Sequence, residues 1–488
     1  MHQNPEKSYV TYEDFGAIGD RSHDDMEAIV ACHDYANAHG LEVRASDTAT
    51  YYIGGRALTA KIQTSTHWGK AHFVIDDVAL ENIHTSCFAA VPDTDRFSVP
   101  ITKLRAGQTQ LDLPYSEDLY IRVYDATHPI YIRKGLNQNA GTPQSDAFVR
   151  LADGRIIGDI NWDYDTVTEA YAFYTGDTPI VIEGGIFTTI ANQAPSFYNY
   201  HARNVSIRRS HVTLRAITHY VTGELDHGAP YNAFLAVHEA YDVTIENCLL
   251  TPHKTYYTAS KIPGKDVPMG SYDLSLHAAI GTRLCGIRQT IDIEDNRYWG
   301  LMGSNFSKEF YMENCTVSRF DAHMGVTNGV IRDCTLGHMG VNLIGFGSFT
   351  VENTTVYASR FINFRTDYGA FFHGTLTVRN CTWIPRNCGK LPAVFFCRNE
   401  GDHDFGYPCA LPEAIVLDGL TVKDSELPID RAIYLFTPYD KPPVADRPYP
   451  YGTTKHIKAS VNTESGRTVV LCKEPSLFPH LSNVKIGD

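Results

Sequence analysis

Apolar and polar residues alternate in a short phrase that recurs along the second half of the chain. Alternation with a period of two is typical of a β-strand with one buried face. Each copy ends in Asn or Asp followed by a small residue, as a tight turn requires. The copies occupy Val243–Cys248, Phe310–Cys315, Val330–Cys334, Phe349–Thr354 and Leu376–Cys381.

The spacing of these copies indicates a repeat architecture. Asn314, Asp333, Asn353 and Asn380 are 19, 20 and 27 residues apart. One strand–turn–strand coil is too small to bury its own apolar side, so successive coils must stack as a solenoid. A leucine consensus and long runs of helical period are both absent, and we therefore predict a parallel β-helix from about residue 180 to about residue 422. The small apolar residues expected to stack inside the coils are Cys248, Cys315, Cys334 and Cys381.

A helix is expected near the N-terminus, over Asp24–Asn37. Its apolar face consists of Met26, Ile29, Val30 and His33, with Ser22 or Asp24 as the N-cap and Gly40 as the stop signal.

Directly before this helix stands Asp-Phe-Gly-Ala-Ile-Gly-Asp at Asp14–Asp20, followed by Asp24 and Asp25. This segment resembles the N-terminal motif of the pectate-lyase-like superfamily of right-handed β-helices. The resemblance covers residues 14–29 and departs at Arg21 and Met26, where the superfamily has Gly and Thr. It implies an all-β fold, a right-handed parallel β-helix solenoid with a capping α-helix at its open end. It does not imply a particular reaction.

The chain divides into four predicted parts. Residues 1–60 hold the N-terminal motif and helical cap, 61–178 an inserted β-rich region, 179–425 the parallel β-helix and 426–488 an extended tail. Within the insertion we expect strands at Ile101–Leu113 and Leu119–Val123. The tail is rich in Pro and Tyr, and it is a candidate for contacts between copies in a homo-oligomer.

The composition of the chain limits the classes of partner that it is expected to bind. The net charge of −14 argues against nucleic acid and against an anionic membrane surface, but it does not exclude a glycan. No run is apolar enough to span a bilayer. Eleven cysteines without pairing or zinc spacing favour reduced thiols. Residues 1–9 carry no apolar signal core, so we expect a cytoplasmic protein, or a secreted one if a signal peptide has been removed.

Aligning the coils on the Asn-Cys phrase places polar side chains in columns. Lys254, Asp321 and Gly340 share one predicted column, and Pro252, Arg319 and His338 share another. Asp295–Arg297 is expected over Ser318–Phe320. Side chains in one column are about 4.8 Å apart. A cleft is therefore predicted on one face of residues 219–373, lined by Asp273, His253, Lys254, Asp295, Arg297, Trp299, Arg319, Asp321, His323, His338, Arg365 and Asp367, with Asp226 and His227 in a loop that walls it.

Each of these residues also has an ordinary structural explanation. Arg319 and Asp321 form a simple ion pair in that view, His338 is a hydrogen-bonded surface residue, and Asp292 and Asp295 form Asx turns. His253 and Lys254 then belong to a polar turn. The joint placement of so many ionisable groups favours function, because such groups cost stability unless they are used or paired.

We expect a glycoside hydrolase, the first of three functions that remain open on this sequence. The first is hydrolysis of an oligosaccharide or polysaccharide, with Asp295 and Asp321 as the catalytic carboxylates, His323 as their assistant and no cofactor. The second is β-elimination from a uronic acid, in which Lys254, Arg319, His323 and Arg365 supply the charge and the base. Ca²⁺ held by Asp292, Asp295 and Asp321 would serve that reaction. The third is a non-catalytic glycan-binding solenoid. The polygalacturonase motifs are absent from the repeats, where Gly337-His338-Met339 comes nearest.

Overall fold

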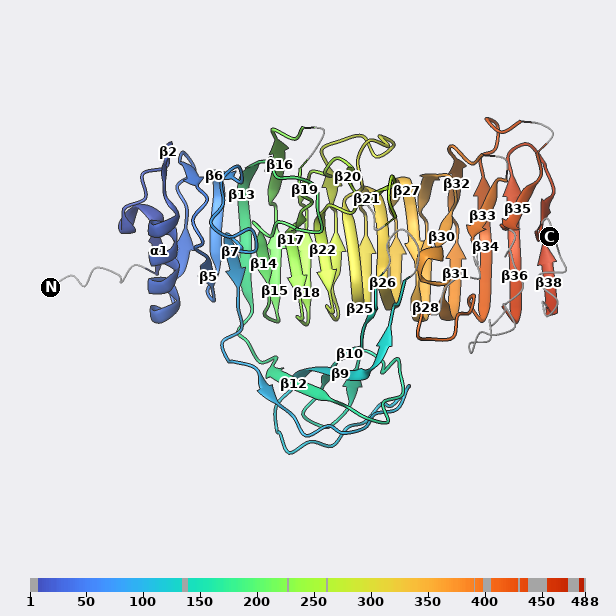
Figure 1. Ribbon diagram of the computed structural model, residues 1–488, viewed down its shortest axis with the longest axis horizontal. Helices are drawn as coiled ribbons and strands as arrows, with labels where there is room; N and C mark the ends of the chain where they lie inside the picture. Colours follow the sequence, from blue (N-terminus) through green and yellow to red (C-terminus); the bar gives the residue numbers. More distant parts are fainter. Residues whose placement is uncertain are drawn as a thin grey trace.

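The computed structural model describes residues 8–133, 139–225, 228–259, 262–389, 391–397, 405–428, 431–437, 454–472 and 482–486. These residues form a long solenoid with one α-helix at its N-terminal end and a separate small sheet beside it (Figure 1). A 31-stranded set of strands builds the solenoid, and all of its ladders are parallel. The predicted parallel β-helix is therefore confirmed.

The elements of the N-terminal coils are β1 (Tyr9–Thr11), η1 (Tyr12–Phe15), β2 (Asp20–Asp24), α1 (Met26–His39), β3 (Glu42–Arg44), β4 (Thr50–Ile53), β5 (Ala60–Ile62), β6 (Thr66–Asp76) and β7 (Phe88–Ala90). The small sheet holds β8 (Phe97–Ser98), β9 (Leu119–Ile130), β10 (Thr142–Arg150), β11 (Ile156–Ile157) and β12 (Glu169–Tyr174).

The central coils hold β13 (Ile180–Ile190), β14 (Val205–Ile207), β15 (Val212–Arg215), β16 (Thr218–Thr222), β17 (Asn232–His238), β18 (Val243–Glu246), β19 (Leu249–Leu250), β20 (Tyr256–Ala259), β21 (Asp266–Met269), β22 (Tyr272–His277), β23 (Arg283–Cys285), β24 (Arg288–Gln289), β25 (Met302–Glu313), β26 (Thr316–Arg332), β27 (Thr335–Leu343), β28 (Gly345–Glu352), β29 (Thr355–Ala358), β30 (Ile362–Phe364) and η3 (Thr366–Tyr368). The C-terminal coils hold β31 (Phe372–Arg379), β32 (Thr382–Pro385), β33 (Ala393–Phe396), β34 (Ala414–Val422), β35 (Ile433–Phe436), β36 (His456–Thr463), β37 (Val469–Val470) and β38 (Ser482–Ile486).

The N-terminal motif forms a loop around one buried carboxylate. Asp25 is 3% exposed, and its side chain accepts the backbone N–H groups of Ile18 at 2.7 Å and Gly19 at 3.2 Å. Asp25, rather than Ser22 or Asp24, occupies the N-cap position of α1, although Asp24 Oδ1 accepts from the Met26 N–H at 3.1 Å. Gly40 ends the helix at φ 64°, as predicted.

The repeated Asn and Asp form a column at one corner of the solenoid. Asn314, Asp333, Asn353 and Asn380 all have a left-handed backbone, with φ between 49° and 54° together with Asn247. Asn and Asp tolerate this conformation better than other side chains, which explains why they recur there. The four cysteines that follow them in the repeats are buried free thiols, also as predicted.

Beside this column runs a ladder of alternating charges. The position before each corner residue is paired in register from coil to coil, and opposite charges across such a ladder stabilise a sheet. Arg332 lies 3.0 Å from Glu352, and Arg379 lies 3.6 Å from the same carboxylate. The ladder reads His67, Glu183, Arg215, Glu246, Cys285, Glu313, Arg332, Glu352, Arg379 and Asp418.

The inserted region is smaller than the predicted 61–178. Strands β5, β6 and β7 pair with solenoid strands, so the separate antiparallel sheet occupies Phe97–Tyr174. Leu119–Val123 lies within β9 as expected, but Ile101–Leu113 forms only isolated bridges. This segment's side chains pack on the small sheet's own core instead of extending a ladder.

The inserted sheet is fixed to the solenoid by buried polar contacts. Lys308 Nζ on β25 donates to Asp146 of β10 and to the carbonyl of Asp159, and both charged side chains are nearly inaccessible. The Tyr120 hydroxyl donates to the Ala278 carbonyl at 2.5 Å, and the Tyr131 hydroxyl donates to the Met324 carbonyl at 3.2 Å. The end of β9 is thereby held against the central coils.

The predicted tail largely continues the solenoid. Strands β35, β36, β37 and β38 each pair in parallel with a preceding coil strand. The repeated phrase disappears after β34, yet apolar side chains such as Ile457 still fill the interior. The segment that holds Pro442, Pro443, Pro448 and Pro450 lies outside the described residues.

Candidate active site

Asp321 on β26 lies at the centre of an arginine–carboxylate cluster. Its side chain is 0% exposed. Arg319 Nη2 lies 2.6 Å from Oδ2, Arg365 Nη1 lies 2.6 Å from Oδ1, and the Tyr272 hydroxyl donates to Oδ2 at 2.6 Å. Burial alone would raise the pKa of Asp321, but the charges of Arg319 and Arg365 outweigh it and lower the pKa to about 2. This carboxylate is ionised at neutral pH.

Arg365 joins Asp321 to a second carboxylate. Its Nη2 lies 2.9 Å from Asp367 Oδ2, and its Nε lies 3.1 Å from Oδ1. The Asp367 side chain is 39% exposed, which makes it the carboxylate of the cluster that a ligand reaches. Burial opposes ionisation here too, but Arg365 and then Arg133 hold the pKa of Asp367 far below its usual range.

The inserted sheet supplies the third guanidinium. Arg133, just beyond β9, places Nη2 2.6 Å from Asp367 Oδ2 and lies over the Tyr368 ring, with Cζ 3.9 Å from the ring centroid. The same Nη2 lies 3.1 Å from His323 Nε2. Arg133 therefore ties the inserted region to the coil that carries His323.

His323 is held as a neutral imidazole. Its Nε2 faces the donor Arg133, so Nε2 accepts and Nδ1 donates to Asn305 Oδ1 at 3.1 Å. Burial, reinforced by the charge of Arg365, lowers the pKa of His323 to about 3. At neutral pH this ring carries no charge, and its Nε2 lone pair accepts from Arg133.

Several buried polar atoms of the cluster lack a partner within the described residues. In most proteins such atoms are satisfied by protein, water or ligand. Those of the cluster and its edge are Arg133 Nε, Arg319 Nε, Trp299 Nε1 and Asn363 Oδ1. Asn363 belongs to the register column of Asp321 and Asn342, and its Nδ2 donates to Asn342 Oδ1 at 2.6 Å. Hydrogen-bonding capacity thus remains where the two coils meet.

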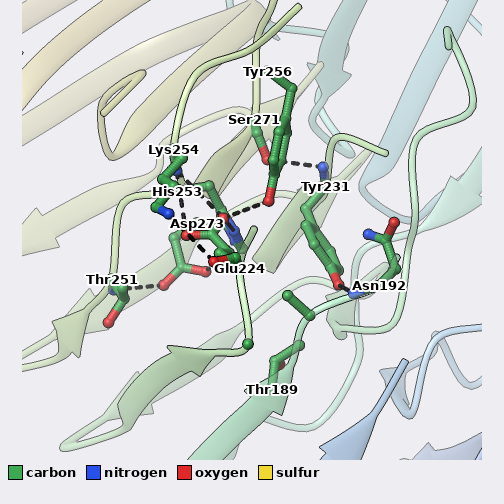
Figure 2. A network of polar contacts seen from close by, with 12 residues as sticks. Thr189, Asn192, Glu224, Tyr231, Thr251, His253, Lys254, Tyr256, Ser271 and Asp273 are labelled. Atoms are coloured by element: carbon green, nitrogen blue, oxygen red, sulfur yellow. Dashed lines mark hydrogen bonds and ion pairs between the residues drawn. The ribbon is translucent and has the colours of Figure 1, made fainter. Parts of the chain in front are cut away.

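A second polar network lies next to the cluster, and its centre, Asp273 with His219 and His253, is buried (Figure 2). Asp273 lies 2.9 Å from His219 Nδ1 and 3.6 Å from His253 Nε2. His253 Nδ1 lies 3.0 Å from Glu224, whose Oε1 also accepts from the Tyr256 hydroxyl at 2.7 Å. A substrate does not reach groups buried this deeply, so we interpret this network as structural support for the loops around it.

The buried network predicts a loss of stability at alkaline pH. Burial opposes the charge on His253, but hydrogen bonds to Asp273 and Glu224 raise its pKa from 6.5 to about 9. Since the folded pKa is the higher one, the stabilisation is complete below pH 6.5 and disappears as the pH rises through about 9. We expect it to be on the order of 3 kcal/mol. Thermal unfolding followed between neutral and alkaline pH should show a steep loss for the native chain and a shallow one for His253→Gln; equal slopes would contradict the assignment.

The predicted columns were wrong in detail. Between β26 and β27 the pairing moves from Val317–Leu336 to Arg319–Gly340, so β27 advances four residues where β26 advances two. Arg319 therefore pairs with Gly340 rather than with His338, and Asp321 pairs with Asn342. Lys254 shares no column with Asp321, because it bridges Tyr298 in antiparallel fashion, and its Nζ donates to the Glu224 carbonyl at 3.3 Å.

Asp295 and Arg297 do not stack over β26 either. They lie in the loop before β25, where Arg297 Nη2 contacts Asp295 Oδ2 at 2.6 Å and is 77% exposed. His338 holds this loop through the carbonyls of Ile293 at 3.1 Å and Tyr298 at 3.2 Å. Asp292 caps a turn by accepting from the Glu294 N–H. The three carboxylates considered for Ca²⁺, Asp292, Asp295 and Asp321, thus have separate partners, and no cluster of three metal-binding side chains occurs in the described part of the chain.

The other predicted residues divide between the two networks. Arg319, Asp321, His323, Arg365 and Asp367 form the cluster, whereas Asp273, His253 and Lys254 belong to the buried network. Trp299 connects them, because its backbone N–H donates to the His253 carbonyl at 3.0 Å and its ring lies 4.8 Å from Arg319 Cζ. Asp226 and His227 lie outside the described residues.

A shallow depression of about 720 Å³ lies elsewhere, on the N-terminal coils. Its floor is the corner column, where Gly69, Gly184 and Ala216 have little or no side chain. Its charged walls pair with one another, as His67 and Glu183 do at 2.6 Å. None of the predicted site residues lines it.

The chain has a parallel β-helix fold, as its repeats and its N-terminal motif predicted. No family model and no curated protein matches it. Similar solved structures include the tailspike gp61 of Pseudomonas phage phi297, with 12% identity, a TM-score of 0.49 and coverage of 93% of this chain and 81% of that chain. The tailspike gp49 of Pseudomonas phage LKA1 has 14% identity, a TM-score of 0.45 and coverage of 96% and 83%. The exopolygalacturonase of Thermotoga maritima has 10% identity, a TM-score of 0.34 and coverage of 95% and 93%. These likenesses concern the fold and not the site.

No helix among the described residues has the length and apolar character needed to cross a membrane.

Proposed function

We propose that this chain is a carbohydrate-active enzyme that cleaves glycosidic bonds in an acidic oligosaccharide or polysaccharide at the arginine–carboxylate cluster. The supporting observation is the local charge. The guanidinium groups of Arg133, Arg319 and Arg365 surround the two carboxylates of Asp321 and Asp367, which leaves one positive charge in excess within a chain of net charge −14. Arginine binds carboxylates with two parallel hydrogen bonds, so the cluster suits a uronate unit.

The protonation states favour β-elimination over hydrolysis. Hydrolysis by paired carboxylates needs one carboxylic acid with a raised pKa. Instead, the pKa values of Asp295, Asp321 and Asp367 are all lowered, and all three groups are ionised at neutral pH. A neutral imidazole beside guanidinium groups is the arrangement that elimination requires.

In the proposed reaction, Arg365 and Arg133 neutralise the uronate carboxylate. Arg133 turns from His323 to the uronate, and the freed His323 Nε2 takes the proton from C5, while the electron pair of that C–H bond forms a double bond between C4 and C5. The bond from C4 to the glycosidic oxygen breaks, and that oxygen gains a proton from water, whose hydroxide takes the proton back from His323. Hydrolysis is the second candidate, because Asp367 is the ionised carboxylate of the cluster that water reaches, but its pairing with Arg365 and Arg133 makes it a weak base.

The test is a panel of glycans with two readouts on each. Polygalacturonate and alginate carry uronates, and a galactomannan is the neutral control. Elimination yields the ultraviolet absorbance of an unsaturated uronate together with new reducing ends, whereas hydrolysis yields reducing ends alone. Arg297→Ala, a change to an exposed arginine outside the cluster, is the matched control for Arg365→Ala. Cleavage of the neutral glycan alone, or equal activity of the two variants, would contradict the proposal.

A further inference from the structure

Exposed apolar side chains gather on three segments beside the candidate active site. These are residues 191–200, strand β16 with the loop after it, and strand β20 with the loop that leads to β21. Among the described residues, ten large apolar side chains are exposed, and six of them lie on these segments. A concentration of this kind on a monomer usually marks a binding surface. We call the six the aromatic rim; they are Phe197, Tyr198, Tyr220, Leu225, Tyr257 and Ile262.

The three segments are held to one another. The Tyr256 hydroxyl on β20 donates to Glu224 Oε1 at 2.7 Å, and Gln193 Nε2 donates to the Gly223 carbonyl at 3.0 Å. Tyr200 packs against the small apolar cluster that includes Tyr256. The loops that follow β16 and join β20 to β21 project from the same edge of the solenoid (Figure 1). The rim is thus carried by a fixed platform.

The alternation of strand β20 explains why the platform presents an aromatic ring. Tyr256 points inward and is buried on Glu224, so its neighbour Tyr257 points outward and is 62% exposed. Tyr257 pairs with Pro268 of β21 in an antiparallel ladder, which fixes its backbone. A rigid strand therefore displays an unshielded ring.

One segment of the rim is uncharged, in contrast to the cluster, whereas the other two segments carry charged residues such as Glu224, Lys265 and Asp266. Residues 191–200 contain no Asp, Glu, Lys or Arg, and their polar groups are amides and hydroxyls. The hydroxyl of Ser196 in this loop is buried and has no partner in the described residues. Aromatic faces with neighbouring amides suit a ligand that has apolar C–H faces and hydroxyl edges but no charge.

The rim is continuous with the cluster through the buried network. Glu224 contacts His253, and the His253 carbonyl accepts from the backbone N–H of Trp299, whose ring covers Arg319. The charge of Arg133 also acts on Tyr200, where it counters the rise in pKa that burial and Tyr198 cause. The two surfaces are therefore joined by one packed network of side chains.

We propose that the aromatic rim binds neutral pyranose units of the same glycan whose acidic unit occupies the arginine–carboxylate cluster. The assignment of the acidic unit rests on the proposed function, whereas the assignment of the rim rests on its own exposed side chains. The substrate class is then a heteropolysaccharide that contains both neutral and uronate units.

Binding is to be measured without turnover, by affinity electrophoresis in gels that contain galactomannan or the mixed neutral and uronate polysaccharide xanthan. The variant is Phe197→Ala with Tyr257→Ala, and Tyr35→Ala, an exposed tyrosine on α1, is the control. We expect about tenfold weaker binding to both polysaccharides for the double variant, since each lost aromatic contact weakens binding severalfold. The control should bind as the native chain does. All of these side chains are exposed, so the thermal midpoint should stay unchanged.

The outcomes separate the two proposals. Native binding to the polysaccharides without cleavage of any uronate glycan would overturn the proposed function and leave the rim assignment standing. Equal binding by the double variant and the native chain would overturn the rim assignment, as would a native chain that binds neither polysaccharide. A double variant that keeps its glycan binding but changes its elution volume in gel filtration would identify the rim as a protein interface, which also overturns it.

Discussion

Replacing Asp321 with alanine should lower the free energy of unfolding by about 3–5 kcal/mol. The change leaves two nearly buried guanidinium groups short of negative charge, because Arg319 loses Asp321 and Arg365 keeps only Asp367. It also removes the acceptor of the Tyr272 hydroxyl. Urea denaturation, followed by circular dichroism, measures the loss.

The matched control is Asp295→Ala. Asp295 pairs with the exposed Arg297, and such surface pairs contribute less than about 1 kcal/mol. A further variant, Asp321→Ala combined with Arg365→Met, removes one of the stranded charges and should recover part of the loss. Similar losses for Asp295→Ala and Asp321→Ala would show that Asp321 is not the electrostatic centre of the site.

The low pKa of Asp321 gives the same prediction a pH dependence. Because the folded pKa of about 2 lies below the ordinary value of 3.8, the contribution of Asp321 is complete above pH 3.8 and declines as the pH falls towards 2. The stability difference between the native chain and Asp321→Ala should therefore be constant at neutral pH and shrink only in strong acid.

Replacing His323 with alanine should lower kcat on a uronate glycan by about 10²–10⁴-fold. The imidazole is the neutral base of the proposed elimination. It contacts Arg133 and Asn305, and among the described residues it forms no hydrogen bond with a carboxylate. Its removal should thus affect activity much more than stability. Initial rates of absorbance at saturating glycan, together with the thermal midpoint, separate the two effects.

His211→Gln serves as the control for this variant, since His211 pairs with Asp242 at 2.7 Å on a surface turn. The native pH profile gives a second check. With the pKa of His323 held at about 3 in the free protein, the acid limb of kcat/KM should fall near that pH and not near 6.5. A His323→Ala enzyme with native kcat, or an acid limb at the ordinary histidine pKa, would exclude His323 as the base.

The fold was predictable because its signals are local and repeated. The alternation of apolar residues identified the strands, and Asn314, Asp333, Asn353 and Asn380 marked the corner at which each coil turns. Beyond β34 the strands continue without that marker, so the predicted end of the solenoid came too early. The cores of these last coils are apolar, but nothing in the sequence distinguishes them from an extended tail.

Most residues of the cluster were predictable from the sequence, but the columns in which they stack were not. Arg319, Asp321, His323, Arg365 and Asp367 gather because all of them lie on neighbouring coils. The predicted columns were wrong because β27 has two extra residues opposite β26. Such a bulge changes the register of the strands without changing the hydrophobic pattern.

Arg133 was missed altogether. It lies 190 residues before His323 in the sequence, and it reaches the cluster only because the inserted sheet docks through Lys308 and Asp146. His219 and Glu224 precede Asp273 by a coil or more, and their burial beside it has no signature in the local pattern. Contacts of this kind depend on tertiary packing rather than on any motif.

The alternating charge ladder limits how the solenoid can be lengthened or shortened. From Glu313 to Asp418 the sign changes at every coil, so deleting or duplicating one coil would set two like charges face to face about 4.8 Å apart. Adding or removing coils in pairs would preserve the order of signs. Growth of this molecule by gene duplication, or its redesign as a longer rod, should therefore proceed in units of two turns.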